Sequence, residues 1–151
     1  MTVPSPPAEA AQALALEAHI LTSFRDVSAD AWDACVPDHH PFVRHAFLSA
    51  LEESGSATAE TGWLGQHVVL KDSHGTVLCA VPMYLKNHSQ GEYVFDHGWA
   101  DAFERAGGRY YPKMQVSVPF TPATGPRLLL RAGAAANEEE AAALQGALLS
   151  A

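Results

Sequence analysis

Between positions 88 and 97 the sequence gathers side chains that can accept and release protons. His88, Glu92, Asp96 and His97 all fall in this short window. Proton transfer near neutral pH needs a group that titrates there, and a histidine beside a carboxylate meets that need. We therefore take His88, Glu92 and His97 as candidate catalytic bases. Two alternatives stay open: a polar loop in which Asp96 caps the following helix, and a metal site without a fixed ligand spacing.

A second group of polar and aromatic residues follows at positions 110–113. The sequence there is Tyr-Tyr-Pro-Lys, directly before a segment of alternating polarity. Aromatic faces and an ammonium group suit sugars or carboxylates, so Tyr110, Tyr111 and Lys113 are candidate substrate-binding residues. The alternative is that the tyrosines pack on the core while Lys113 points into solvent.

Sequence motifs for covalent or metal-dependent catalysis are missing. The chain contains no Gly-x-Ser-x-Gly, no His-Glu-x-x-His and no phosphate-binding P-loop. Its two cysteines, Cys35 and Cys79, have neither Cys-x-x-Cys nor zinc-ligand spacing. We therefore expect two buried thiols and no bound metal.

Composition and charge narrow the class of partner. The 151 residues are 48% hydrophobic and 17% charged, with a formal net charge of -8. These are the values of a globular domain, and the three widely spaced lysines do not favour binding to duplex nucleic acid. No lysine or arginine precedes Arg25, as a signal peptide would require, and no apolar run has membrane-spanning length. We expect a cytoplasmic protein that does not span a membrane.

The elements that must position these residues follow from periodicity and capping. Residues 1–18 are Pro-rich and then Ala-rich, which predicts a disordered or weakly helical leader before a domain at residues 19–151. Predicted strands cover residues 19–24, 67–71, 77–85, 93–95, 114–120 and 128–130. Predicted helices cover residues 29–36, 41–54, 99–106 and 138–151. This order indicates an α+β fold, with one mixed, mainly antiparallel sheet flanked by helices.

Two segments are distinctive enough to resemble a known family. Residues 84–100 read YLKNHSQGEYVFDHGWA, and residues 110–129 read YYPKMQVSVPFTPATGPRLL. Together with Gly62-Trp63 and FLSALEESGS at residues 47–56, they resemble bacterial proteins described as GNAT-family N-acetyltransferases or peptidoglycan-biosynthesis proteins, which are related to the Fem-type aminoacyltransferases. The resemblance spans about residues 20 to 130.

That resemblance implies a GNAT-like fold and an N-acyltransferase. Its donor would be acyl-CoA or an aminoacyl-tRNA, and its acceptor an amine on a small molecule or a peptidoglycan precursor. Such proteins carry two GNAT-like domains in tandem, and this chain matches the N-terminal one. The last predicted helix is still running at Ala151. We therefore expect an incomplete copy of a two-domain protein, whose partner is the missing C-terminal GNAT-like domain.

The resemblance also implies a donor-binding turn, for which residues 121–127 are the best positional match. Thr121, Thr124, Gly125 and Arg127 are accordingly the candidate cofactor-binding residues. The turn departs from the usual GNAT pattern, because it has one glycine and two prolines, which lack amide donors, and no helix follows directly. A rigid turn with a solvent-facing arginine is the alternative. Two other functions therefore stay open: a non-catalytic GNAT-like binding module and a metal-dependent hydrolase.

Overall fold

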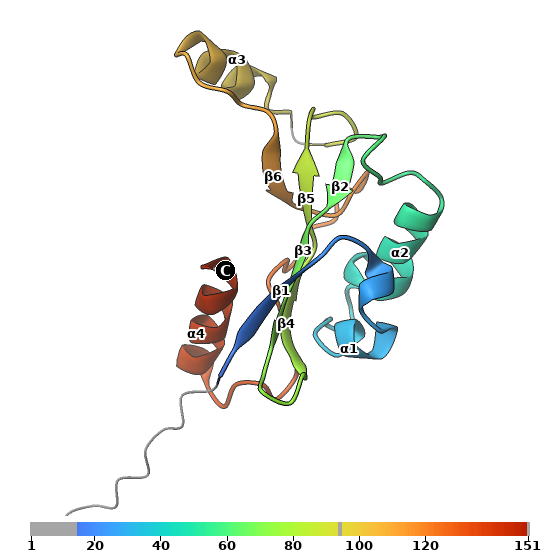
Figure 1. Ribbon diagram of the computed structural model, residues 1–151, viewed down its shortest axis with the longest axis vertical. Helices are drawn as coiled ribbons and strands as arrows, with labels where there is room; N and C mark the ends of the chain where they lie inside the picture. The colour runs from blue at the N-terminus through green and yellow to red at the C-terminus, as the bar shows by residue number, and fades with distance from the viewer. Residues whose placement is uncertain (1–14, 94, 151) are drawn as a thin grey trace, which may run out of the picture.

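The computed structural model describes residues 15–93 and 95–150 (Figure 1). Most of the predicted leader lies outside these residues. The first strand, β1, already begins at Glu17, two residues before the predicted domain boundary. No strand forms at Tyr93 or Phe95, where a short one was predicted.

The remaining elements follow the predicted order with shifted bounds. The strands are β1 (Glu17–Leu21), β2 (Trp63–Gly65), β3 (His67–Lys71), β4 (Val77–Val81), β5 (Met83–Lys86), β6 (Lys113–Val116) and β7 (Leu129–Leu130). The α-helices are α1 (Ala29–Asp33), α2 (His45–Glu53), α3 (His97–Arg105) and α4 (Glu138–Leu149), and single 3-10 turns form at Phe24–Asp26 and Pro41–Val43. The α+β class is confirmed.

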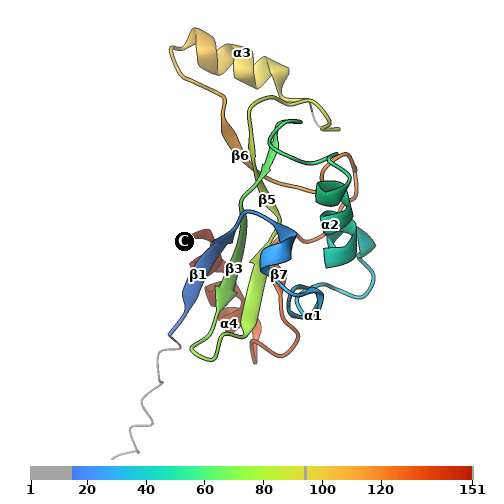
Figure 2. The same ribbon diagram turned by 45° about the vertical axis from the view of Figure 1, so that its right-hand side comes forward.

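The strands form two antiparallel sheets where one sheet was predicted. The larger has the order β1-β3-β4-β7 and the smaller the order β2-β5-β6. Figure 2 shows β1 and β3 of the larger sheet side by side, while β5 and β6 continue toward α3. The sequence pattern does not reveal this division, because it predicts where strands lie along the chain and not which strands pair.

Pro82 divides the predicted strand 77–85 between the two sheets. Proline has no N–H to give to a ladder, so regular pairing is interrupted at its position. Val81 is the last β4 residue paired with β3, and Met83 is the first β5 residue paired with β6. The Met83 N–H turns to the buried ring of His67 and donates to its Nδ1 at 3.2 Å. One continuous segment therefore serves both sheets.

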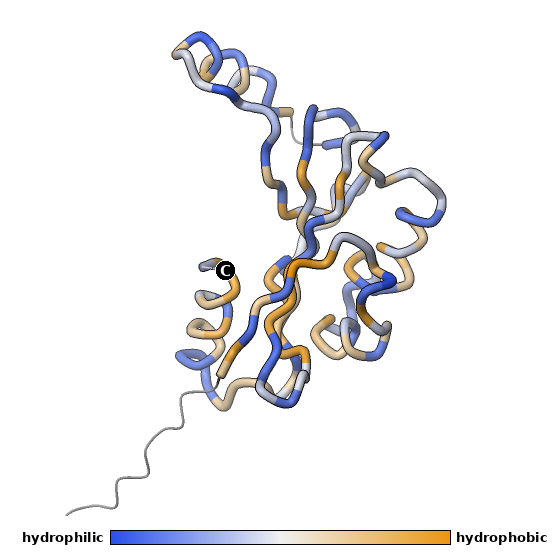
Figure 3. The backbone as a smooth tube through the Cα atoms, viewed as in Figure 1, coloured by the Kyte–Doolittle hydropathy of each residue, from blue (hydrophilic) through white to orange (hydrophobic). Residues whose placement is uncertain are grey.

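Helices cover both faces of the larger sheet. Helices α1 and α2 lie on one face, where Trp32 is fully buried and its Nε1 donates to the Val43 carbonyl at 2.8 Å. Helix α4 covers the other face through Leu144 and Leu148. Figure 3 shows hydrophobic colouring along β4, and every residue of this strand is buried. This is the main core of the domain.

Helix starts that depend on local sequence form as predicted. The Ser28 side chain accepts a hydrogen bond from the Ala31 N–H, and the Asn137 side chain accepts one from the Glu140 N–H. Such side-chain caps satisfy amides that have no partner inside the helix. The helix predicted at residues 41–54 is interrupted, since Arg44 is extended between a 3-10 turn and α2.

The smaller sheet is polar where a buried face was predicted. Met114 and Val116 are 52% and 40% exposed, whereas Lys113 and Gln115 turn inward. The alternation predicted for this segment is present in β6, but the apolar side chains face outward and the polar ones inward. Beyond this sheet α3 exposes Trp99 to 77%. Among the described residues, no helix combines the length and apolar character needed to cross a bilayer.

Candidate functional site

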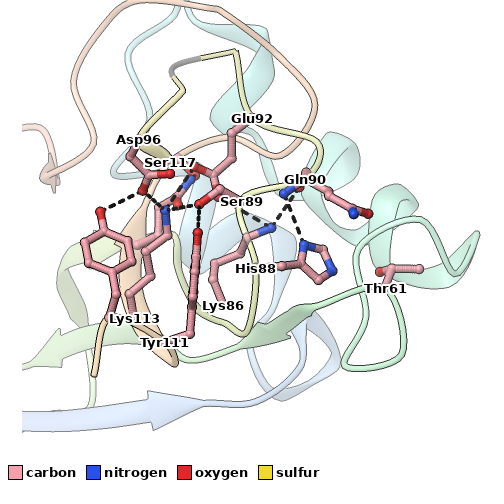
Figure 4. Close-up of polar contacts among 12 residues, drawn as sticks. Thr61, Lys86, His88, Ser89, Gln90, Glu92, Asp96, Tyr111, Lys113 and Ser117 are labelled. Carbon is pink, nitrogen blue, oxygen red and sulfur yellow. Dashed lines mark hydrogen bonds and ion pairs between the residues drawn. The ribbon is translucent and has the colours of Figure 1, made fainter. Parts of the chain in front are cut away.

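The inward face of the smaller sheet carries a network centred on the Lys113 ammonium. Its Nζ donates to Ser89 Oγ at 2.9 Å, to Glu92 Oε2 at 3.1 Å and to Asp96 Oδ2. Figure 4 shows these three side chains converging on Lys113. Ser89 is also within 2.6 Å of the Tyr111 hydroxyl. Residues up to 24 positions apart thus form one polar cluster.

Asp96 belongs to this network and does not cap α3 with its side chain. It occupies the N-cap position, yet its carboxylate makes no hydrogen bond to the helix. Instead, Asp96 Oδ2 accepts from the Tyr110 hydroxyl at 2.8 Å and from Lys113. Burial alone would raise the pKa of Asp96, but these hydrogen bonds outweigh it and hold the pKa well below its usual range. Asp96 therefore stands at the predicted N-cap position of α3, but its side chain caps no amide of the helix.

Lys86 extends the network into the interior. Its side chain is fully buried, and its Nζ lies 3.3 Å from the centroid of the Trp63 ring and 3.7 Å from Glu92 Oε1. Its Nζ also donates to the Gln90 carbonyl at 3.1 Å. Burial lowers the pKa of Lys86 to about 8, although Glu92 opposes the change. Two lysines therefore flank the Glu92 carboxylate.

A cavity of about 390 Å³ lies beside this network. Glu92 borders it from the loop after β5, and the segment from Val116 to Arg127 forms its other wall. This volume is in the range of small-molecule sites. Glu92 Oε1 is buried and has no hydrogen-bond partner among the described residues. The cavity thus has a charged wall residue, whose Oε1 lies 3.7 Å from Lys86 Nζ and makes no hydrogen bond within the described part of the chain.

A glycine lets the two walls of this cavity come together. Gly91 has a φ of 78°, a left-handed conformation that other residues rarely adopt. A Cβ at this position would lie 2.4 Å from the Phe120 ring. The ring of Phe120 in turn packs on Trp63, with 5.4 Å between centroids. Gly91 therefore allows the loop after β5 to pack against the segment after β6.

Comparison with known protein families matches most of the chain. Residues 23–150 match the FemAB-like family, described as peptidoglycan biosynthesis/recognition. The chain belongs to the FemAB-like family. No curated protein and no solved structure matches it. The family match confirms the Fem-type resemblance and gives this FemAB-like chain a role in peptidoglycan biosynthesis or recognition.

The candidate bases of this FemAB-like chain do not lie together. Glu92 is part of both the network and the cavity wall. His88 lies outside both; its Nδ1 accepts from the Gln90 N–H at 3.1 Å. His97 is exposed and stacks on Phe95, with 6.0 Å between ring centroids. Of the three, only Glu92 borders the cavity.

The candidate substrate residues are joined by direct contacts. Tyr110 and Tyr111 each place the Lys113 ammonium near their rings, with Nζ 5.7 Å and 5.8 Å from the centroids. Burial alone would lower the pKa of Lys113, but the carboxylates of Asp96 and Glu92 raise it by more than burial lowers it. The pKa of Lys113 therefore lies above its usual value. Lys113 therefore stays protonated at neutral pH.

The turn at residues 121–127 forms one side of the cavity. Thr121, Thr124 and Arg127 border it. Gly125 instead packs on His40, whose ring would lie 2.4 Å from a Cβ at that position. The Arg127 guanidinium donates to the Gly125 and Pro126 carbonyls at 3.2 Å and approaches His40 Nε2 at 3.1 Å. These bonds stabilise the turn and leave fewer donors for a ligand.

Several participants in the site were missed in the sequence. Lys86, Ser89 and Gln115 contribute to the network or the cavity without having been singled out. Lys86 carried a signal, because a lysine at the end of an apolar strand needs a partner if it is buried. The metal site has no support: within residues 15–93 and 95–150, no group of three or more His, Cys, Asp or Glu side chains could hold an ion.

Proposed function

We propose that this chain takes part in N-acyl transfer to an amine during peptidoglycan biosynthesis, with the cavity beside Glu92 holding part of the substrate. The observation that carries the proposal is the cavity itself, where Glu92 faces the turn containing Thr121, Thr124 and Arg127. Membership of the FemAB-like family supplies the substrate class. The reaction would take place in the cytoplasm, with the help of a second GNAT-like domain.

The chemistry needs few groups. The amine attacks the carbonyl carbon of a thioester or ester; a C–N bond forms, and the C–S or C–O bond breaks. A base removes the proton from nitrogen, and the leaving thiol or hydroxyl takes up a proton. Glu92 Oε1 is the proposed acceptor for an amine N–H, since it makes no hydrogen bond within the described residues and has the Lys86 ammonium beside it only at ion-pair distance, 3.7 Å. Acyl-CoA or an aminoacyl-tRNA would supply the acyl group.

A direct test titrates the chain by calorimetry with a soluble uridine-diphosphate-linked muramyl pentapeptide. We expect saturable binding that weakens about tenfold in Glu92→Gln, because the variant loses a charged acceptor. Glu60→Gln is the matched control, since Glu60 is exposed and outside the cavity. Absence of binding, or an equal loss in both variants, refutes the assignment of the cavity.

A second function, a non-catalytic binding module, is favoured by one observation. Arg127 donates hydrogen bonds to carbonyl groups of its own turn, and the two prolines of this turn have no N–H to donate. Titration with acetyl-CoA separates the two functions. Heat with both donor and precursor supports the transferase, whereas heat with the precursor alone supports the binding module.

A further inference from the structure

A second pocket lies at the C-terminal end of α2, and Trp63 borders both this pocket and the cavity at Glu92. Its volume is about 200 Å³, below the usual range for whole small molecules. It therefore suits a short chemical group. None of the residues predicted from the sequence as site residues lines it.

Negative charge dominates this pocket. Glu52 is the one formally charged residue among those that line it. The carboxylate is fixed in place, because it accepts hydrogen bonds from the Ser23 hydroxyl and from the Phe24 N–H at 2.9 Å. Glu52 also stands in the last turn of α2, where the carbonyl end of the helix adds partial negative charge. The helix dipole does not favour a carboxylate there, so a cation would find two sources of attraction.

The imidazole ring of His67, which also lines the pocket, adds no positive charge. His67 is 1% exposed, and its Nδ1 accepts from the Met83 N–H. An amide can only donate, so Nδ1 carries no proton and the ring is neutral. Burial accordingly lowers the pKa of His67 to about 4.

Aromatic rings form the walls around Glu52. Phe24, Trp63 and Tyr84 all line the pocket, and the rings of Trp63 and Tyr84 meet edge to face at 5.3 Å. Ring faces attract cations, most strongly in tryptophan. The Trp63 ring already holds one ammonium, that of Lys86. Burial, with the charge of Glu52, raises the pKa of Tyr84, so its hydroxyl stays neutral.

We propose that this pocket binds a primary ammonium group at the end of a short aliphatic chain, with the ammonium at Glu52 and the chain against Phe24, Trp63 and Tyr84. The size admits such a chain end, the single carboxylate selects a cation, and the aromatic walls bury methylene groups. The site is separate from the cavity at Glu92, and the proposal holds whether or not the chain transfers acyl groups.

The test uses the full chain labelled with 5-fluorotryptophan and observed by ¹⁹F NMR. The three tryptophans give three resonances, and Trp63→Phe assigns the one that reports on the pocket. The probe is n-butylammonium chloride, compared with 1-butanol and sodium butyrate at equal ionic strength. We expect a saturable shift of the Trp63 resonance with n-butylammonium and none with the other two. An equal response to butanol or butyrate, or no response to the amine, overturns the proposal.

A pair of variants on α2 locates the charge. Glu52→Gln should weaken n-butylammonium binding at least tenfold. Glu53→Gln, the same change at the exposed neighbouring position, should leave binding unchanged. Equal losses in both variants overturn the assignment of Glu52. If Glu52→Gln does not fold by circular dichroism, the comparison of the three probes on the unmodified chain still decides the proposal.

Discussion

Lowering the pH from 7 to 5 should destabilise the folded chain through one buried side chain, His67. The pKa of His67 falls from its ordinary value of 6.5 to about 4 because burial disfavours the charged ring. Above pH 6.5 neither the folded nor the unfolded chain holds a proton there. Between pH 6.5 and pH 4 only the unfolded chain takes up the proton, so the free energy of unfolding falls as the pH falls.

The magnitude follows from the two pKa values. The gap between 6.5 and about 4 corresponds to about 3.5 kcal/mol at roughly 1.4 kcal/mol per pH unit. About 2 kcal/mol of this is lost by pH 5, before most carboxylates begin to titrate. This loss is large compared with the free energy of unfolding of a typical domain, which is roughly 5–15 kcal/mol.

Urea unfolding followed by circular dichroism at pH 7, 6 and 5 measures this loss. In His67→Asn the amide oxygen can still accept from the Met83 N–H, but nothing titrates. The variant will be less stable at every pH, since the ring packs 4.2 Å from Phe24 by centroids. Its pH dependence should be smaller than that of the unmodified chain by about 2 kcal/mol. His74→Asn, at an exposed turn, should keep the full dependence. Equal pH dependence in His67→Asn and the unmodified chain would refute the reasoning.

Three further changes test the network and the core, each by urea unfolding. Asp96→Asn should lower the free energy of unfolding by about 2 kcal/mol, because it removes the negative charge that faces Lys113. The control Asp101→Asn, at an exposed position, should lower it by under about 0.5 kcal/mol. Equal losses contradict the network. The pKa of Lys86 is about 8 in the folded chain and 10.5 ordinarily, so between these pH values only the unfolded chain keeps the proton and the free energy of unfolding rises with pH. Lys86→Met should remove this rise. A rise that persists in the variant contradicts the assignment. Leu148→Ala beneath α4 should cost about 2–3 kcal/mol and exposed Leu149→Ala under about 0.5 kcal/mol; the reverse order would place the wrong face of α4 on the sheet.

Features that depend on neighbouring residues could be predicted from the sequence. The caps at Ser28 and Asn137 are local, because each side chain bonds an amide three residues away. Residues 77–85 were predicted as one strand, and strands do form on both sides of Pro82. The change of sheet at Pro82 depends on where β3 and β6 lie in space. A sequence pattern has no access to that arrangement.

The site shows the same limit. The cavity brings Glu92 together with Thr121 and Arg127, and all three belong to segments that the sequence singled out. Lys86 escaped notice because its burial depends on Trp63, which lies 23 positions earlier. His97 was a candidate base from the same short window as Glu92, yet it begins α3 and is exposed to solvent. Closeness along the chain was a poor guide to closeness in the fold.

Pro82 also gives the chain two regimes of tolerance to change. Residues Val77–Val81 are all buried in the main core, so substitutions there disturb the whole domain. Residues Met83–Lys86 belong to the smaller sheet, in which Tyr84 and Lys86 are buried while Met83 and Leu85 are half-buried. Substitutions at Met83 and Leu85 should therefore disturb the fold less than substitutions in β4 or at Tyr84 and Lys86. A single imino acid thus separates a stretch in which every position is constrained from one in which only alternate positions are.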